Sequence, residues 1–383
     1  MPDLSELLFN AVGPERTHAG VTTYTRYVPP DDSKVFPPSF PTDGRSEEPP
    51  YLFEKRRVDG EPCDVVVLDQ VPSQANRVET ALLDARDAGR IQLPLFELTT
   101  TASDGIPVRL TSLQFPHRFA DAYLRDSQID GVKFDNTEIG RRLRSTTATD
   151  VRPLFEYSPE SLVFGGWDSH RKGRGVKIPR FYSATVFGLE PEKGERASGR
   201  MDPLNLSGAV KHTSQGGWEF TPTGEKKQGE RLSELGHGNI APSPAHGGVA
   251  ISEARRSGWL SLSGLANLRF GDASDEAARL ARATLLALAL AGDRLAFDAP
   301  SLWLRSGCDL VRTHQQLTLE GGAESEPMDV SAEQAIACFH ELRERTARAG
   351  ITMSTDTVPL APQPGLAQAI DYSLTRAEYG EAE

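Results

Sequence analysis

The chain has 383 residues, of which 38% are hydrophobic and 25% are charged, and its mean hydropathy is −0.41. These values are typical of a soluble globular protein, and the 34 glycines and 27 prolines predict many turns. The net charge of −12 argues against indiscriminate binding to nucleic acid, because the long-range field of an anionic protein repels phosphate.

No stretch approaches the roughly 20 apolar residues that span a bilayer, and residues 1–10 contain no basic segment ahead of an apolar one. We therefore expect a cytoplasmic protein without a membrane partner. The three cysteines, Cys63, Cys308 and Cys338, are odd in number and far apart, which excludes a disulfide framework and a CxxC zinc site. Neither a metal nor another cofactor is expected.

The first regular elements follow Cys63. The β-branched run at 65–68 predicts a buried strand, and Ser73 is the expected N-cap of a helix that Gly89 closes. Residues 91–98 and 107–113 predict two more strands. Strand, helix, strand, strand is the first half of a ferredoxin-like unit of the RRM type, so the predicted fold class is α+β.

Further strands are expected at 161–166, 181–189, 249–252, 259–270 and 301–310. The Leu- and Ala-rich segment 275–291, followed by Gly292, predicts a core helix that packs on a sheet. Ser331 opens another helix with a capping box to Gln334. The proline-rich tail after Ile351 has few candidate core residues.

These elements predict three regions. Residues 1–62, rich in proline, glycine and charge, predict an irregular N-terminal arm. Residues 63–320 form the expected RRM-like palm, with a helical insertion at about 114–160 and a thumb-like insertion at about 190–246. Residues 321–383 form the expected C-terminal helix and tail.

The first candidate binding segment is the start of the helix after the first buried strand. Gln74, Asn76 and Arg77 lie in its first turns, where free backbone N–H groups and an added guanidinium favour a phosphate site. The equally supported alternative is that Ser73 only caps the helix and Arg77 pairs with Asp69. The sequence leaves both interpretations open.

The second candidate is a basic strip between Trp167 and Arg180. It combines an aromatic side chain for base stacking, cations for phosphates and glycines that allow close approach of a ligand. Its cations are Arg171, Lys172, Arg174, Lys177 and Arg180. Such a concentration of charge on an acidic chain favours a groove for a nucleic-acid strand, and the alternative is a solvated basic loop.

Catalytic motifs are not evident. Residues 224–229 have P-loop glycine spacing, but Glu230 and Arg231 stand where Lys and Ser or Thr are required. His237 and His246 lack a further metal ligand at suitable spacing. No catalytic residue is therefore assigned. Asp168 with His170 remains a possible acid/base pair for a metal-dependent ribonuclease.

Five ordered segments together resemble a known family: residues 68–77, 168–180, 199–203, 237–243 and 302–310. They resemble the type I-U (I-G) CRISPR-associated backbone protein, a Geobacter-founded family of the RAMP superfamily. The resemblance covers most of the chain and leaves the tail after Gly321 outside.

The resemblance implies a non-enzymatic subunit of a Cascade-like antiviral complex, repeated side by side along a guide CRISPR RNA. The implied partners are that RNA, target DNA read through the guide, copies of the chain itself, other Cascade subunits and a recruited helicase-nuclease. The strip and the five segments give these expected RNA-binding residues: Gln74, Asn76, Arg77, Trp167, Ser169, His170, Arg171, Lys172, Arg174, Lys177, Arg180, Arg200, His237 and Asn239.

Two alternatives remain open. A metal-dependent endoribonuclease of CRISPR RNA processing would use Asp168 and His170. A protein-interaction module would use the basic strip to dock an acidic partner.

Overall fold

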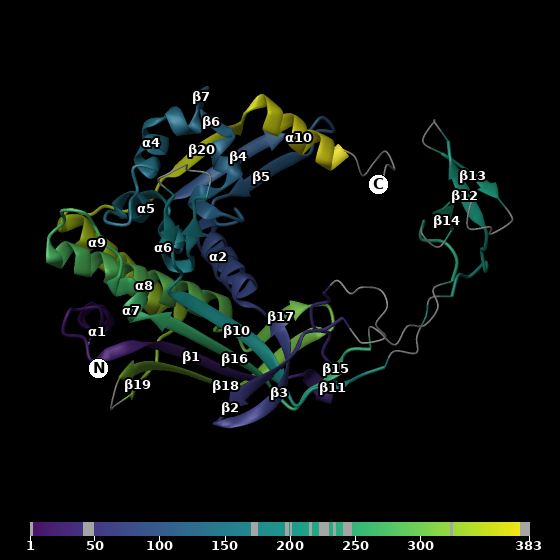
Figure 1. The fold of residues 1–383 in the computed structure, drawn as a ribbon, viewed down its shortest axis with the longest axis horizontal. Helices are drawn as coiled ribbons and strands as arrows, with labels where there is room; N and C mark the ends of the chain where they lie inside the picture. Colours follow the sequence, from purple (N-terminus) through teal and green to yellow (C-terminus); the bar gives the residue numbers. More distant parts are fainter. Residues whose placement is uncertain are drawn as a thin grey trace.

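A computed structural model of the chain describes residues 3–40, 50–169, 175–195, 199, 201–213, 217–221, 230–232, 235–239, 247–321 and 325–375. Its largest sheet has eight strands, and every neighbouring pair in it is antiparallel. In spatial order the strands are β17 (Ser301–Arg305), β18 (Cys308–Gly321), β1 (His18–Val28), β16 (Ala254–Ser261), β10 (Tyr182–Leu189), β3 (Glu61–Asp69) and β2 (Phe53–Val58), and β19 (Ser325–Met328) pairs with β18. Figure 1 shows this sheet curled across the lower part of the molecule.

Two long helices cover one face of the main sheet. Helix α2 (Val71–Asp87) lies in the chain between β1 and β10, and α8 (Asp275–Phe297) lies between β16 and β18. The two helices contact each other, and α2 also contacts β10. Burial alternates along β1, where Val21 and Tyr27 are buried, as expected for a sheet with one covered face. The fold is α+β, as the sequence predicts.

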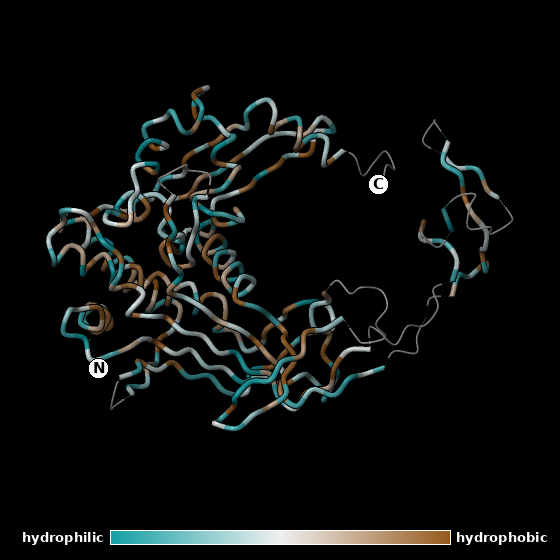
Figure 2. Tube along the Cα trace, viewed as in Figure 1, coloured by the Kyte–Doolittle hydropathy of each residue, from teal (hydrophilic) through white to brown (hydrophobic). Residues whose placement is uncertain are grey.

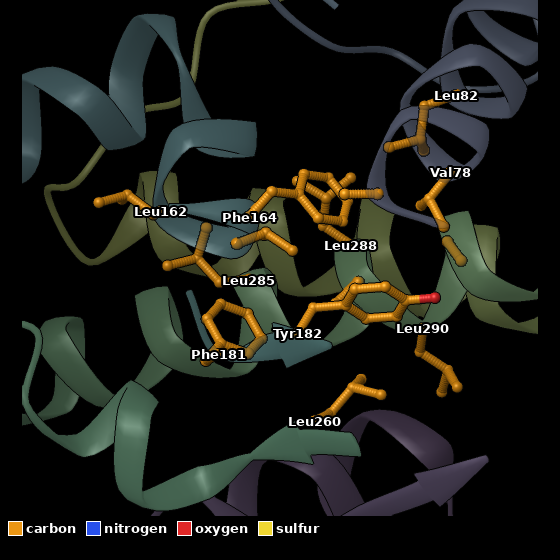
Figure 3. Packing of buried hydrophobic residues seen from close by; sticks show 14 of the residues in the cluster. Val78, Leu82, Leu162, Phe164, Phe181, Tyr182, Leu260, Leu285, Leu288 and Leu290 are labelled. Atoms are coloured by element: carbon orange, nitrogen blue, oxygen red, sulfur yellow. The ribbon is translucent and has the colours of Figure 1, made fainter. Parts of the chain in front are cut away.

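Helix α8 is buried along most of its length because other elements surround it. Helices α1 (Leu4–Ala11), α6 (Pro159–Phe164) and α9 (Ala332–Arg348) contact it as well as α2. In Figure 3, side chains of α2, α6, β10 and β16 meet around Leu285, Leu288 and Leu290 of α8. Figure 2 shows hydrophobic residues recurring along this helix and the strands beneath it.

Gly292 lies inside α8 rather than at its end, so the prediction that it terminates the helix was wrong. A Cβ atom on Gly292 would lie 2.5 Å from Cγ1 of Val78. The glycine thus allows α8 to approach α2 closely. A closing role cannot be told from a packing role by the residue type alone.

A second, five-stranded sheet lies above the main sheet in Figure 1. Its strands in spatial order are β5 (Pro107–Thr111), β4 (Leu95–Thr101), β20 (Thr357–Pro362), β6 (Ser127–Ile129) and β7 (Val132–Lys133). The strands predicted near 91–98 and 107–113 therefore do not pair with the strand that precedes α2, and that part of the predicted unit was wrong. Tail strand β20 pairs parallel with β4, which buries Leu360.

The expectation of an irregular arm over residues 1–62 was also wrong, because β1 lies between β16 and β18 in the main sheet. Alternate threonines on its buried face, Thr23 and Thr25, made its burial pattern hard to recognise from sequence. Residues 161–166, predicted as a strand, lie mostly in the short helix α6, which begins with Pro159 in its first turn. Short apolar runs do not by themselves distinguish a strand from a buried helix.

Other helical segments connect the layers: η1 (Pro30–Asp32), η2 (Arg118–Ala120), α3 (Ala122–Arg125), η3 (Phe134–Asn136), α4 (Glu138–Arg144), α5 (Arg152–Tyr157), α7 (Leu262–Ala266) and α10 (Pro364–Thr375). Helix α9 begins with the predicted capping box between Ser331 and Gln334. Among the described residues, no helix combines the length and apolar character required to cross a membrane.

The predicted excursion contains a small sheet that stands apart from the main body in Figure 1. It consists of β13 (Trp218–Thr221), β12 (Ala209–His212) and β14 (Glu230–Arg231). Strands β11 (Glu192–Lys193) and β15 (Val249–Ala250) pair where the excursion leaves and rejoins the body. Trp218 and Phe220 of the small sheet are exposed.

Candidate nucleic-acid interface

The described part of the basic strip forms a two-stranded hairpin, β8 (Gly166–Trp167) and β9 (Lys177–Ile178). Trp167 pairs with Lys177 across the hairpin, and the Lys177 Nζ atom lies 5.8 Å from the centre of the Trp167 ring. The indole is 63% exposed, so the cation–π contact leaves a large aromatic face accessible to a ligand. The hairpin therefore presents an aromatic group and a cation side by side.

The hairpin borders a hollow of about 440 Å³. Its lining residues are Pro116, His117, Arg118, Ala120, Phe164, Gly165, Gly166, Trp167, Ser169, Lys177, Ile178, Pro179 and Arg180. None of these residues is acidic. Lys177 and Arg180 are exposed, and no carboxylate of the described residues lies within 4.0 Å of either cation. We call this the Trp167 hollow.

The floor of the Trp167 hollow is built around Gly165 and Arg118. Gly165 has a φ of +85°, and a Cβ atom there would lie 3.0 Å from the backbone nitrogen of Arg180. A glycine is required at such a position, because an L side chain would be both strained and crowded. Arg118 donates to the Gly165 carbonyl oxygen at 3.0 Å and so ties the hairpin to η2.

Arg118 is in turn held by a buried carboxylate of α2. Its Nε and Nη2 atoms donate to Glu79 at 2.5 and 2.9 Å. Burial raises the pKa of Glu79, and the bonds from Arg118 oppose that rise. The charge of Arg118 is thus used internally, whereas Lys177 and Arg180 present theirs to the hollow.

Two further acids close to the hairpin in sequence are buried. Asp168 is only 2% exposed and accepts a bond from Nη1 of Arg144 at 3.0 Å. Glu160 is buried and bonds to the hydroxyl of Ser158; burial raises its pKa to about 7 against the opposing effect of that bond. Asp168 thus ties the hairpin to Arg144 of α4, and Ser169 beside it is exposed.

The start of α2 is arranged differently from the expectation. Ser73 lies inside the helix, and Gln70 occupies the N-cap position without a side-chain capping bond, so the predicted cap was wrong. Arg77 pairs with Asp69 at 2.8 Å, which is the structural alternative that the sequence left open. Arg77 also donates to the Leu304 carbonyl oxygen of edge strand β17 at 2.9 Å.

Gln74 is fully buried, and both of its amide atoms have partners inside the protein. Its Nε2 atom donates to Asp69 at 2.6 Å, and its Oε1 atom accepts from Nε of Arg256 at 2.9 Å. Arg256 and its partner Asp293 are both 0% exposed, and Arg294 also pairs with Asp293 at 2.6 Å. Gln74 therefore belongs to a buried polar network that joins β16, α2 and α8.

Asn76 is exposed but lies away from the Trp167 hollow. It borders a shallow depression together with Arg77 and Trp303, whose side chain is 64% exposed. None of the expected residues at the start of α2 lines the Trp167 hollow.

Two of the sequence segments meet within the excursion. Asn239 accepts a bond from the backbone nitrogen of Asp202 at 2.7 Å, and Asp202 accepts one from the backbone nitrogen of Gly238 at 2.6 Å. Backbone bonds from Gly238 and Leu204 lower the pKa of Asp202. His237 is exposed, with its ring 6.4 Å from that of Trp218. These contacts give Asn239 a structural role in the loop.

The structure thus gathers Trp167, Ser169, Lys177 and Arg180 in one hollow. Five other predicted residues lie outside the described part of the chain: His170, Arg171, Lys172, Arg174 and Arg200. Sequence reasoning missed His117 and Arg118, which reach the hollow from a segment far earlier in the chain and carry no local motif. Within the described ranges, no group of three or more His, Cys, Asp or Glu side chains is placed to hold a metal ion.

Comparison with known proteins shows which protein family part of the chain resembles. Residues 22–192 match the family model described as CRISPR-associated protein GSU0053, a span that contains the start of α2 and the basic strip. The matched segment is therefore similar to a family of CRISPR-associated proteins. The family matched is the Geobacter-founded one, and the match confirms the resemblance seen in the sequence. No curated protein matches the chain. The family supports a role in CRISPR defence.

Proposed function

We propose that the chain is a non-enzymatic backbone subunit that binds guide CRISPR RNA in a Cascade-like complex, with the Trp167 hollow as one of its RNA contacts. The observation that carries this proposal is the composition of the hollow. An exposed indole, Lys177 and Arg180 meet there with no carboxylate in the lining, on a chain whose net charge is −12. Stacking on an indole together with cations for phosphates is the usual means of holding a single strand.

The strand order supports a palm of the RRM type. Strands β1, β10, β16 and β18 occur in this order in the chain, with other strands between them. In space they stand in the order β18-β1-β16-β10, and α2 and α8 lie in the connections between β1 and β10 and between β16 and β18. This is the arrangement of the fourth, first, third and second strands in a ferredoxin-like unit. The small sheet β12–β14, which stands apart from the body, suits the proposed thumb.

The buried environment of Asp168 favours a binding role over ribonuclease chemistry. Its carboxylate is 2% exposed and engaged by Arg144, so it does not face the hollow where RNA would lie. In the proposed complex the guide pairs with target DNA, copies of the chain lie side by side along the guide, and a recruited helicase-nuclease cleaves.

The test is to express the full chain with its operon partners and to sequence and quantify the nucleic acid that copurifies. Wild type is expected to carry RNA of discrete length with repeat-flanked spacers. The variant Lys177→Glu/Arg180→Glu is expected to retain roughly tenfold less RNA, because charge-assisted bonds are replaced by repulsion. The control Lys133→Glu/Arg348→Glu makes the same change in charge at exposed positions outside the hollow.

If Lys177→Glu/Arg180→Glu copurified with as much RNA as the control variant, the proposed contact would be refuted. Cleavage of bound RNA on incubation with divalent metal would favour the ribonuclease instead. A complex that assembles without any nucleic acid would favour a protein-interaction module. A salt titration separates the last case, because RNA affinity falls linearly on a log-log plot of affinity against salt.

A further inference from the structure

A second basic hollow lies where α1, α7 and the start of α8 meet. It has a volume of about 510 Å³. Its lining residues are Phe9, Val12, Gly13, Pro14, Arg16, Ala266, Arg269, Asp275, Glu276, Arg279 and Arg282. Four arginines from three separate segments therefore line one hollow, which we call the arginine hollow.

None of these arginines forms an ion pair with a carboxylate of the described residues. In the part of the chain that the structure describes, no carboxylate lies within 4.0 Å of Arg16, Arg269, Arg279 or Arg282, although Asp275 and Glu276 belong to the same lining. Elsewhere in the structure many arginines pair with acids, as Arg118 does with Glu79 and Arg152 with Asp150. Cations without counter-ions in one hollow repel one another, and a bound anion would reduce that repulsion.

The guanidinium groups are held in place by neutral partners. Arg279 donates to the Phe9 carbonyl oxygen at 2.9 Å and to Asn10 at 3.0 Å. Arg282 donates to the Leu268 carbonyl oxygen at 2.8 Å. These bonds orient the side chains without cancelling their charge, as in a pre-organised anion site.

Arg282 has the most constrained environment of the four. Its Nε atom is buried without a hydrogen-bond partner among the described residues. Burial lowers the pKa of Arg282, the neighbouring charge of Arg269 lowers it further, and the charge of Asp275 opposes both effects. A buried donor without an acceptor is costly, so this position is maintained at a cost in stability.

We propose that the arginine hollow binds a phosphate group. A phosphate offers several acceptor oxygens around one centre, and arginine forks bind such oxygens in a bidentate manner. A protein carboxylate offers only two oxygens, both in one plane, whereas the oxygens of a phosphate point in several directions from one centre. The site is separate from the Trp167 hollow, since the two linings share no residue. The inference does not depend on the proposed RNA contact.

The test uses the full chain in phosphate-free buffer at constant ionic strength, with inorganic phosphate as the first probe. Calorimetric titration is expected to show binding that Arg16→Gln/Arg269→Gln weakens at least about tenfold. These two arginines make few bonds to the rest of the protein: Arg269 donates to the Ala266 carbonyl oxygen at 3.2 Å, and the Arg16 side chain has no hydrogen bond to another described residue. If the double variant fails to fold, Arg16→Gln alone is expected to weaken phosphate binding in the same direction.

The matched control is Arg90→Gln/Arg348→Gln, which removes two exposed arginines outside the hollow. It is expected to bind phosphate as wild type does. A second arm adds single-stranded uridine RNA as a competitor. Displacement of phosphate from wild type by RNA identifies a nucleic-acid backbone as the source of the phosphate group, and failure of displacement identifies a free phosphate compound.

Two results would overturn the proposal. In the first, Arg16→Gln/Arg269→Gln binds phosphate as tightly as the control does. In the second, poly-glutamate binds at the hollow while neither phosphate nor RNA does, which would assign the site to an acidic protein partner.

Discussion

Replacement of Asp293 by Asn tests the buried network that holds Gln74. The substitution preserves shape but removes the negative charge that pairs with Arg256 and Arg294, which are 0% and 1% exposed. Leaving buried charges without their counter-ion costs about 3–5 kcal/mol. Because folded domains are stable by only about 5–15 kcal/mol, we expect a large fall in the urea concentration at which the protein is half unfolded.

The assay is equilibrium urea unfolding followed by circular dichroism, with Glu344→Gln as the control. Glu344 pairs with Arg348 at 4.0 Å on the surface, where a salt bridge contributes at most about 1 kcal/mol. Equal unfolding midpoints for Asp293→Asn and wild type would refute the reasoning.

The pairing of Asp293 with Arg256 and Arg294 also predicts how stability changes with pH. Burial alone would raise the pKa of Asp293, but the charges of Arg256 and Arg294 outweigh it and lower the pKa to about 2. An acid whose pKa is lowered on folding contributes stability above its unfolded value of about 3.9. Wild type is therefore expected to lose this contribution as the pH falls from about 4 to about 2, and Asp293→Asn is expected to lack that dependence.

Three further predictions follow. Gly292→Ala is expected to destabilise the protein by about 1–3 kcal/mol in urea unfolding despite better helix propensity, because its Cβ would lie 2.5 Å from Val78; greater stability would contradict this packing. Because burial raises the pKa of Glu160 to about 7, the stability of wild type should fall as the pH rises from 4.5 to 7, whereas that of Glu160→Gln should not. Parallel plots of stability against pH for the two proteins would contradict this. Trp167→Ala should weaken binding of single-stranded RNA by about 1–3 kcal/mol in an anisotropy titration without changing the salt dependence; unchanged affinity would exclude stacking.

The sequence predicts those elements best whose signals are local. The capping box at Ser331, the core helix from Asp275 and the strand near Tyr182 all depend on residues close together in the chain, and the structure contains them. The grouping of Trp167 with Lys177 was also accessible, because a hairpin joins them directly.

Pairings between distant segments could not be read in this way. Strand β1 has buried threonines, which hide the alternation of apolar and polar residues. Strand β20 pairs with β4, although the two strands are far apart in the sequence. Gln74 is a polar residue at a helix start, as expected of a surface phosphate ligand. Its side chain is nevertheless buried, because its amide oxygen accepts a hydrogen bond from Arg256 of the distant strand β16. Only the tertiary fold determines which polar side chain near a helix start is buried.

The most direct test of the Trp167 hollow is the salt dependence of binding to single-stranded uridine RNA, measured by fluorescence anisotropy. Lys177→Gln/Arg180→Gln removes two cations, so the slope of log affinity against log salt should become shallower by about 1.4, at roughly 0.7 per phosphate contact. The control Lys133→Gln/Arg348→Gln should keep the wild-type slope. Identical slopes and affinities for wild type and the Lys177→Gln/Arg180→Gln variant would contradict the account.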